Sequence, residues 1–307
     1  MAQKDFITIR SYSAAEIRHL IDLALDIKAN PVRYSDVLRG KALAMIFEKP
    51  SLRTRVTFDV GIHQLGGFSI YLSPAEINLG KRESVADVAR NLERMVQGIM
   101  ARTFSHKVVE ELGSHAHVPV INGLTDYNHP CQAMADYLTL LEVKKKLSGI
   151  KLAYVGDGNN VAVSLIHGAA RLGVHLAVAT PPGYEPNPEV VAWARAHGVE
   201  TGCTIDLTQD PSEAVHEADA VYTDVWTSMG QEAESALRLR IFRPYQVDEE
   251  LFSKARPDAV FMHCLPAHRG EEATDAVIES PRSVVFQQAE NRLHAQKAIM
   301  AALMGQR

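Results

Sequence analysis

The sequence is poor in the features that mark several classes of protein. Its 307 residues include three cysteines, at positions 131, 203 and 264, and no CxxC pair. This pattern excludes a disulfide framework and a zinc ribbon, and it favours a reducing compartment. No apolar run approaches the roughly 20 residues that a membrane-spanning helix needs. The first residues carry charge and no apolar core, so they do not resemble a secretory signal.

The chain also has no excess of basic charge. The formal net charge is -5, and no run of Lys and Arg is longer than Lys144–Lys146. A protein that binds nucleic acid through its phosphates needs a basic footprint, which this chain lacks. With 46% hydrophobic and 22% charged residues, the composition is that of an ordinary globular protein. We therefore expect a cytoplasmic protein with neither a nucleic-acid nor a membrane partner.

What the chain does contain is an alternation of strand and helix patterns. A length of 307 residues favours two domains over a single core. Short apolar runs between helical patterns predict strands at 42–47, 68–72, 97–103, 118–121, 151–155, 175–179, 220–222, 259–262 and 283–286. Such alternation is typical of parallel sheets covered by helices. The break at Ser148-Gly149 divides it, so we predict an α/β fold with domains at 1–147 and 148–288.

Helix signals are clearest near the two ends of the chain. Ser13-Ala-Ala-Glu16 is a capping box before an amphipathic helix, and residues 289–304 form a second apolar helix, with Arg292 expected near its start. Between them, residues 224–247 show no regular pattern. A loop of that length in a compact domain is usually functional or mobile.

The most informative stretch is Ser51-Leu-Arg-Thr-Arg55, which follows the first predicted strand and opens a helix. The first turn of a helix presents free backbone N–H groups and the positive end of the dipole, which together favour an anion. Ser51 and Thr54 add hydroxyl groups, and Arg53 adds a planar fork suited to phosphate. The alternative is a capping serine beside solvated arginines. The density of donors favours phosphate binding.

A second turn, Gly156-Asp-Gly158-Asn-Asn160, also follows a predicted strand. It departs from the dinucleotide pattern GxGxxG because position 161 is Val161, and no acidic residue is placed for a ribose. We therefore expect no nicotinamide cofactor. The turn instead presents amide side chains at the carboxyl end of a strand, where ligands of open α/β sheets bind.

Other polar residues follow predicted strands or lie where helices begin. Each alone has an ordinary explanation, such as a loop histidine, a buried thiol or a structural ion pair. Together they place cations, amides, a carboxylate and a thiol at one rim, formed by the ends of the predicted strands. That set of groups suits a phosphate-bearing ligand and an amine-bearing ligand. These residues are Arg102, His129, Gln132, Asp224, His263, Cys264 and Arg292. Neither a metal-ligand spacing nor a GxSxG nucleophile motif is present.

Four motifs resemble those of the aspartate/ornithine carbamoyltransferase family, and of its ornithine branch in particular. They are Ser-Leu-Arg-Thr-Arg at 51–55, His-Pro-Cys-Gln-Ala at 129–133, Asp-Val-Trp-Thr-Ser-Met-Gly at 224–230 and His-Cys-Leu-Pro at 263–266. The resemblance runs over essentially the whole chain. It implies a first domain for carbamoyl phosphate, a second for ornithine, and a last helix, 289–307, that returns to the first domain. It also implies a homotrimer with shared active sites. We expect no cofactor and no bound metal.

Carried over residue by residue, the resemblance assigns phosphate binding to Ser51, Arg53, Thr54 and the backbone of Arg55, and it gives Arg292 as a further contact to carbamoyl phosphate. It assigns the carbamoyl group to Arg102, His129 and Gln132. It assigns ornithine to Asn160, Asp224, Ser228 and the backbone of Met229, with Cys264 and Leu265 beside the reacting end. The expected catalytic residues are Arg102, His129, Thr54 and Cys264.

One position departs from the family. Asn78 lies in Ile77-Asn-Leu-Gly80, the loop that in the family reaches the phosphate site of the next subunit, where Gln or His is commoner. The shorter amide can still donate a hydrogen bond, but over a shorter distance.

The implied reaction is attack of the neutral δ-amine of ornithine on the carbamoyl carbon, with negative charge developing on the carbamoyl oxygen. Arg102, His129 and Thr54 are the expected donors to that oxygen, and one such donor typically supplies ~2.7–4 kcal/mol. Phosphate then leaves and can take the proton, so no protein nucleophile is needed.

Two alternatives stay open on the residues. A carbamoyltransferase with another acceptor, such as putrescine, would not need groups for an α-amine and α-carboxylate, which Asp224 and Asn160 offer. A non-catalytic binding protein on the same fold would not need to keep all four of Arg102, His129, Arg292 and Cys264.

Overall fold

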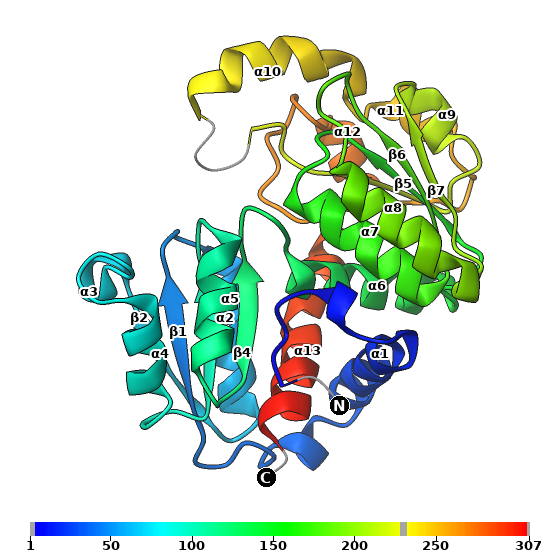
Figure 1. The fold of residues 1–307 in the computed structure, drawn as a ribbon. Helices are drawn as coiled ribbons and strands as arrows, with labels where there is room; N and C mark the ends of the chain where they lie inside the picture. The colour runs from blue at the N-terminus through cyan, green and yellow to red at the C-terminus, as the bar shows by residue number, and fades with distance from the viewer. Residues whose placement is uncertain (1–3, 228–231, 306–307) are drawn as a thin grey trace. The chain divides into compact units, whose positions relative to one another are not determined.

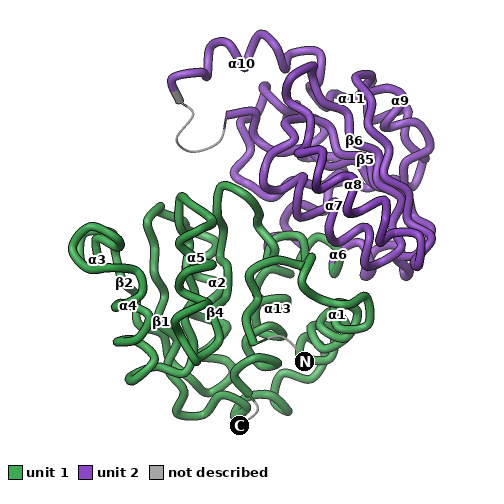
Figure 2. The backbone as a smooth tube through the Cα atoms, in the orientation of Figure 1, with its two compact units in different colours: residues 1–138, 290–307 green, residues 139–289 purple. Residues whose placement is uncertain are grey.

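The computed structural model describes residues 4–227 and 232–305 (Figure 1). The chain divides into two compact units, residues 1–138 with 290–307 and residues 139–289 (Figure 2). Each unit contains one parallel sheet flanked by helices, which confirms the predicted α/β class. Within the described residues, every helix is too short or too polar to span a membrane.

Unit 1 is built on a four-stranded sheet in the order β2-β1-β3-β4. The strands are β1 (Ala42–Phe47), β2 (Phe68–Leu72), β3 (Gly98–Arg102) and β4 (Val120–Leu124). All six residues of β1 are buried, as expected for an apolar run inside a parallel sheet. The edge strand β2 has no fully buried residue, so burial decreases toward that edge of the sheet.

The helices of unit 1 begin at residues that the sequence marks clearly. They are α1 (Ala14–Ala29), α2 (Leu52–Gln64), α3 (Pro74–Ile77), α4 (Val85–Leu92) and α5 (His106–His115). Ser13 and Glu16 form the predicted capping box at the start of α1. After α2 the chain turns at Gly66, where φ is 87° and an added Cβ would lie 2.7 Å from the Ser35 carbonyl oxygen. Only glycine fits that turn.

Unit 2 is built on a five-stranded sheet in the order β7-β6-β5-β8-β9. The strands are β5 (Lys151–Val155), β6 (His175–Ala179), β7 (Ile205–Thr208), β8 (Ala220–Thr223) and β9 (Val260–His263). The helices are α7 (Asn160–Leu172), α8 (Pro188–Gly198), α9 (Pro211–Val215), α10 (Ser235–Phe242), α11 (Glu249–Ser253) and α12 (Asp275–Ile278). Most residues of α7 are buried, as expected for a helix that is apolar on nearly every side.

Two long helices contribute residues to both units, α6 (Pro130–Lys144) and α13 (Val285–Met304). The later part of α13 packs on the first helices of unit 1. Lys28 Nζ of α1 donates to Asn291 Oδ1 at 2.8 Å, and Lys297 Nζ donates to Gln64 Oε1 of α2 at 2.9 Å. The last helix therefore returns to the first unit, as predicted.

Each sheet has a point at which the direction of winding reverses. In unit 1 the chain passes from β1 out to β2 and then returns to β3 on the other side of β1. In unit 2 it passes from β5 to β6 and β7 and then returns to β8. Ligands of open parallel sheets bind beyond the carboxyl ends of the strands at such switch points. The ends of these central strands, with the turns and first helical residues that follow them, carry several of the residues predicted for the site, namely Ser51, Arg53, Thr54, Arg102, Asn160 and Asp224.

Two predictions near the C-terminus are wrong. Residues 283–286 form no strand, because only Ser283 makes an isolated bridge, to Phe261, and α13 already begins at Val285. The short apolar run favours a strand locally, but it continues into a long helix. Arg292 consequently lies about two turns inside α13 rather than near its start.

Two elements in the middle of unit 2 were not predicted. The strand β7 was not predicted, because Ile205–Thr208 is a partly exposed edge strand that includes Asp206. Residues 224–247 are not irregular throughout, since they contain α10. Polar side chains hide both elements from a search for apolar periodicity.

Candidate active site

The first turn of α2 carries the predicted phosphate site. Ser51 is the N-cap residue of this helix, and its Oγ accepts a hydrogen bond from the Thr54 N–H at 3.3 Å. The capping interpretation of Ser51 is therefore correct, but it does not exclude a ligand. The cap uses the hydroxyl oxygen as an acceptor, so the proton can still be donated.

The Thr54 hydroxyl is the meeting point of two arginines from distant parts of unit 1. Arg292 Nη2, from α13, donates to Thr54 Oγ1 at 2.7 Å, and Arg102 Nη1, from the end of β3, donates to it at 3.4 Å. All three residues are buried. Because the oxygen accepts from two guanidinium groups, the hydroxyl proton must point elsewhere. The Thr54 hydroxyl can therefore donate its proton to a ligand.

His129, which precedes α6, is buried beside these cations. Burial holds the pKa of its imidazole well below the usual value, and the charges of Arg292, Arg102 and Arg53 lower that pKa further. The ring is therefore neutral at physiological pH, with one N–H donor and one acceptor nitrogen. Three guanidinium groups around a neutral ring make this part of unit 1 attractive to an anion.

Gln132, in the first turn of α6, is buried and oriented by Asp136. Its Nε2 donates to Asp136 Oδ1 at 2.8 Å, and its Oε1 has no hydrogen-bond partner in the described part of the chain. An amide held by its nitrogen presents its carbonyl oxygen as an acceptor. Gln132 is thus suited to receive an N–H group of a ligand.

The Arg55 side chain is turned away from this cluster. Its guanidinium group lies 3.9 Å from the centre of the Tyr71 ring, on the edge strand β2. Only the backbone of Arg55 therefore remains for a phosphate contact, which is the role that the resemblance implies. Arg53, in contrast, contributes its charge at His129.

Asn78 is exposed at the end of α3. Figure 1 shows that helix beside the edge strand β2. Asn78 is the C-cap residue, with φ 41° and ψ 52°. Asparagine tolerates this left-handed conformation better than most residues, and glutamine lacks that tolerance. Its carbonyl accepts the N–H groups of Lys81 and Arg82, both at 3.0 Å. The backbone therefore gives one reason for asparagine here, and its contact with a neighbouring subunit stays a prediction.

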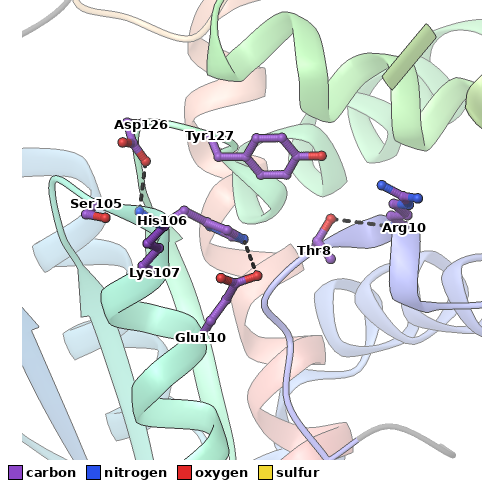
Figure 3. Close-up of a pocket in the computed structure, with 8 residues that line it drawn as sticks. All are labelled: Thr8, Arg10, Ser105, His106, Lys107, Glu110, Asp126 and Tyr127. Atoms are coloured by element: carbon purple, nitrogen blue, oxygen red, sulfur yellow. Dashed lines mark hydrogen bonds and ion pairs between the residues drawn. The ribbon is translucent and has the colours of Figure 1, made fainter. Parts of the chain in front are cut away.

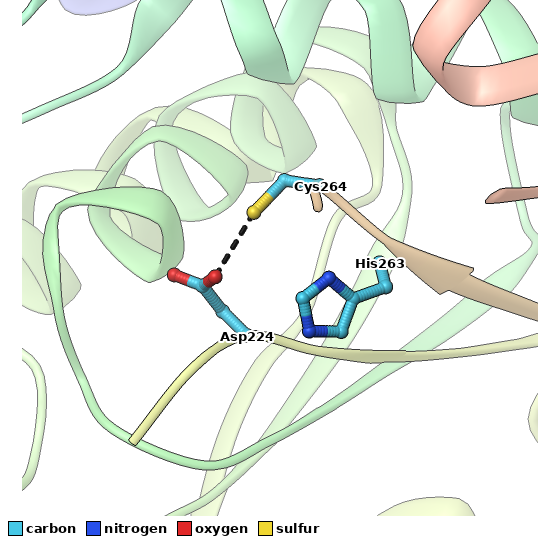
Figure 4. A group of neighbouring side chains, drawn as sticks. All are labelled: Asp224, His263 and Cys264. Atoms are coloured by element: carbon cyan, nitrogen blue, oxygen red, sulfur yellow. Dashed lines mark hydrogen bonds between the residues drawn. The ribbon is translucent and has the colours of Figure 1, made fainter. Parts of the chain in front are cut away.

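In unit 2, the carboxylate of Asp224 follows β8 and binds groups from two other strand ends, and Figure 4 draws one of these contacts, the one with Cys264. Cys264 Sγ, after β9, donates to Asp224 Oδ1 at 2.9 Å, and Asn159 Nδ2, after β5, donates to Oδ2 at 2.8 Å. Each carboxylate oxygen can accept more than one hydrogen bond. Asp224 can therefore still receive a cationic amine.

A buried pair supports the loop beside Cys264. His263 Nδ1 accepts the Leu265 N–H at 2.8 Å, so its proton lies on Nε2, which is 3.1 Å from Glu272 Oε1. Leu265 has φ 57°, an unusual value for a bulky residue. The hydrogen bond from its N–H holds this conformation and fixes the backbone next to the thiol.

Asp224, His263 and Cys264 also offer ligand atoms within 4.8 Å of one another, which is a spacing that a metal ion could use (Figure 4). In this arrangement the thiol donates to Asp224, and both nitrogens of His263 make hydrogen bonds. Each of the three side chains is therefore engaged in hydrogen bonds in this structure.

The remaining residues predicted for ornithine are only partly described. Asn160 is the first residue of α7, and its carbonyl accepts a hydrogen bond from Ser164 Oγ at 2.9 Å. Ser228 and Met229 lie outside the described residues. Asp224 and Cys264 are thus the two predicted residues that the structure brings into direct contact in unit 2.

A pocket of about 660 Å³ lies elsewhere in unit 1, between the N-terminal segment and α5 (Figure 3). Its cations Arg10 and Lys107 share the pocket with two acids. Glu110 Oε1 lies 3.7 Å from Nε2 of the His106 ring, and Asp126 Oδ1 accepts the backbone N–H of His106 at 2.8 Å. The pocket is therefore nearly balanced in charge, and none of the described site residues lines it.

Comparison with known proteins assigns a family to both units. Residues 4–142 match the model of the carbamoyl-P binding domain of aspartate/ornithine carbamoyltransferase, and residues 148–303 match the Asp/Orn binding domain of the same family. The chain belongs to the aspartate/ornithine carbamoyltransferase family. The resemblance drawn from the motifs is thereby confirmed.

Relatives within the carbamoyltransferase family cover the whole chain. An ornithine carbamoyltransferase of Thermococcus kodakarensis is 54% identical over 310 residues, which is 99% of this chain and 98% of the relative. A solved ornithine carbamoyltransferase of Pyrococcus furiosus has a TM-score of 0.95 at 53% identity, covering 98% and 97% of the two chains. A solved acetylornithine transcarbamylase complexed with acetylcitrulline has a TM-score of 0.89 at 33% identity, covering 99% and 100%. Because carbamoyltransferases for different acceptors share the fold, the choice of acceptor must lie in side chains.

Three residues that support the carbamoyltransferase site were assigned no role from the motifs. Asp136 orients Gln132, Asn159 binds Asp224, and Glu272 holds His263. The i,i+4 spacing of Gln132 and Asp136 on a helix is a signal that could have found the first. The sequence shows two neighbouring amides, Asn159 and Asn160, but it does not show which of them binds Asp224. No local sequence pattern indicates that Glu272 binds His263.

Proposed function

We propose that this chain is an ornithine carbamoyltransferase. It transfers the carbamoyl group of carbamoyl phosphate to the δ-amino group of L-ornithine and forms L-citrulline and phosphate, a reaction of arginine metabolism. The observation that carries the proposal is the convergence of Arg102 and Arg292 on the Thr54 hydroxyl, beside a neutral His129. Identity of 54% to a full-length ornithine carbamoyltransferase supports the choice of acceptor.

Unit 1 holds carbamoyl phosphate in this proposal. The phosphate lies at the first turn of α2, where Ser51, Arg53, Thr54, the Arg55 backbone and Arg292 are its donors. The carbamoyl oxygen faces Arg102 and His129, and the Thr54 hydroxyl proton is directed to the same ligand. The carbamoyl NH2 group donates to Gln132 Oε1, which the hydrogen bond to Asp136 turns toward an N–H donor.

Unit 2 holds ornithine. Asp224 receives the α-ammonium group, and Asn160, Ser228 and the Met229 backbone bind the rest of the amino-acid end. Cys264 and the Leu265 backbone lie beside the δ-amine. Asp224 is suited to an ammonium group because both of its oxygens are already oriented by donors from other loops.

The chemistry needs only polarisation and proton transfer. The δ-nitrogen lone pair forms a bond to the carbamoyl carbon, and the C=O electrons move to oxygen, where Arg102, His129 and Thr54 stabilise the charge. The electrons then return, the bond to the phosphate oxygen breaks, and the phosphate accepts the proton that the amine loses. Holding both substrates in register contributes the proximity effect.

The test is product formation with four acceptors in parallel: ornithine, acetylornithine, putrescine and aspartate. We expect carbamoyl transfer to ornithine alone, with citrulline as the product. Transfer to acetylornithine or putrescine alone would overturn ornithine as the acceptor, while carbamoyl phosphate would remain the donor. Absence of transfer to all four would overturn the enzyme assignment.

We infer further that the chain assembles as a homotrimer, as the resemblance implies. Supporting this, Leu52, Val56 and Val60 form one face of α2 at four-residue spacing and are 75%, 48% and 39% exposed. Phe68 and Ile70, on the adjoining edge strand β2, are 52% and 43% exposed. Such an apolar face is typical of a protein interface, and it starts at the phosphate-binding end of α2.

Light scattering on Val56→Glu tests the assembly. We expect a mass below that of the trimer, with a parallel loss of activity, because the substitution places a charge in an apolar interface. Val32→Glu is the matched control, since Val32 is 84% exposed on another segment. A wild-type protein that is monomeric at assay concentrations would overturn the trimer.

We also propose a reducing compartment such as the cytoplasm. Cys131 and Cys203 are free thiols in the structure, and the Cys264 thiol donates a hydrogen bond that an oxidised sulfur would lose.

A further inference from the structure

Arg238, on α10, joins two loops at the switch point of the unit 2 sheet. Its side chain is 8% exposed. Its Nη1 donates to Asp157 Oδ2 at 2.8 Å and to the Trp226 carbonyl oxygen at 2.9 Å, while its Nε donates to Glu234 at 3.1 Å. Asp157 belongs to the loop after β5 and Trp226 to the loop after β8, so one guanidinium group connects both.

The same two loops carry the groups that meet at the predicted ornithine site. Asn159 lies two residues after Asp157, and Asp224 lies two residues before Trp226. The hydrogen bond from Asn159 Nδ2 to Asp224 Oδ2, at 2.8 Å, connects the same two loops that Arg238 connects. A shift of either loop would therefore change the direction in which the Asp224 carboxylate points.

The surroundings of Arg238 keep the guanidinium group in one position. It lies over the rings of Tyr184 at 5.0 Å and Phe242 at 5.9 Å. The Phe242 ring also stacks on the buried Trp226 at 6.0 Å. A cation at this depth needs its carboxylate partner, and removing either one leaves the other charge buried.

The ion pair also affects the charge near Asp224. Asp157 is almost as buried as Arg238. Burial raises the pKa of the Asp157 carboxyl group, the Arg238 guanidinium lowers it, and the charge of Asp224 adds to the rise. Without Arg238, the buried Asp157 carboxylate would lose its guanidinium partner while still experiencing the charge of Asp224. Arg238 therefore neutralises Asp157 and leaves Asp224 as the carboxylate that can attract an ammonium group.

We propose that Arg238 is a positioning residue for the amino-acid acceptor. It does not touch the substrate. By holding Asp157 and the Trp226 carbonyl, it keeps the Asp224 carboxylate in the orientation that binds the α-ammonium group. This proposal rests on the proposed ornithine carbamoyltransferase activity.

Steady-state kinetics of Arg238→Met test the proposal. We expect KM for ornithine to rise about tenfold, the loss of about one charge-assisted hydrogen bond, with KM for carbamoyl phosphate within twofold of wild type. Arg238→Lys should recover part of the loss, because it restores the charge without the fork. Arg240→Met is the matched control: Arg240 is exposed on the same helix and makes no ion pair in the described part of the chain.

A second variant keeps the test valid if Arg238→Met does not fold, as its melting curve would show. Asp157→Asn preserves the shape of the side chain and removes its charge, and we expect a smaller, ornithine-specific rise in KM. If Arg238 acts through Asp157, the double variant should be no worse than Arg238→Met alone. An unchanged KM for ornithine in folded Arg238→Met and Asp157→Asn, or equal effects on both substrates, would overturn the positioning role. Wild-type protein without activity would instead overturn the proposed function.

Discussion

Cys264 Sγ donates a hydrogen bond to Asp224 Oδ1 over 2.9 Å, and this contact joins the ends of β9 and β8. A carboxylate beside a thiol disfavours the thiolate, because two negative charges would face each other. Cys264 is therefore a hydrogen-bond donor that orients Asp224, and it is poorly suited to be a nucleophile. That agrees with a reaction in which the substrate amine attacks directly.

The first prediction concerns Asp224. In Asp224→Asn the α-ammonium group loses its anionic partner, and we expect KM for ornithine to rise about 100-fold, equivalent to about 2.7 kcal/mol. Cys264→Ala should cost less, because it removes only one donor to the carboxylate, and Cys264→Ser should cost least. Asp206→Asn, an exposed carboxylate on β7, serves as the control. A reversed order among the three variants would contradict this account.

The second prediction concerns the Thr54 hydroxyl. Thr54→Val keeps the shape of the side chain and removes the group that accepts from Arg292 and Arg102 and donates to the ligand. We expect kcat to fall about 10²–10³-fold, the usual effect of losing one preorganised donor, while Thr54→Ser retains most activity. Thr57→Val, three residues along the same helix, removes a hydroxyl that donates only to backbone carbonyls and should leave kcat close to wild type.

The contact between Thr54 and Arg292 shows where sequence-based prediction ends. The strand β1, the cap at Ser51 and the start of α2 are local features, and the apolar run and the hydroxyl residues marked all three. Arg292, however, is 238 positions from Thr54. No periodicity carries that information, and the family motifs supplied only the expectation that both bind carbamoyl phosphate.

The errors have a related cause. Val284, Val285 and Phe286 have side chains typical of strands, yet they lead into α13, where Val285 is buried and Phe286 is 67% exposed. Tertiary packing, which is not visible locally, decides between the two conformations. Asn159 was seen at the end of a predicted strand, but its choice of Asp224 as a partner required the strand order β5-β8.

The third prediction concerns acid stability. The pKa of His129 in the folded protein lies well below the ordinary value of about 6.5. When the pH falls below about 6.5, the unfolded chain binds a proton at this position and the folded chain does not. The free energy of unfolding should therefore fall by up to about 1.4 kcal/mol per pH unit until the folded pKa is reached.

His129→Gln removes the titrating imidazole, so the free energy of unfolding of this variant should depend less on acid pH than that of the wild type. The measurement is the denaturation midpoint of both proteins between pH 5 and pH 8 in phosphate-free buffer. The two curves should run parallel above about pH 7.5 and approach each other below about pH 6.5. Added phosphate should weaken the acid sensitivity of the wild type, because a bound anion offsets the arginines around His129. Parallel curves over the whole range would contradict a neutral, buried imidazole.

The last prediction separates two roles of Asn78. Its backbone is left-handed, with φ 41°, and glycine adopts that conformation most easily. If the position matters only for the shape of the loop, Asn78→Gly should keep KM for carbamoyl phosphate, and Asn78→Ala should raise it modestly through strain. If the side-chain amide reaches the phosphate site of a neighbouring subunit, both variants should raise KM to a similar extent.

We expect the second outcome, with a rise of about 5- to 10-fold in KM for carbamoyl phosphate and none for ornithine, since one neutral hydrogen bond is lost. The decisive experiment mixes subunits of two variants in one assembly. Trimers assembled from Asn78→Gly and Arg292→Ala subunits contain some sites in which an intact Arg292 meets a neighbour with an intact Asn78. Sites of that kind should regain the wild-type KM if Asn78 acts across the interface. A mixture whose activity is only the sum of the two separate variants would place the effect of Asn78 within its own subunit.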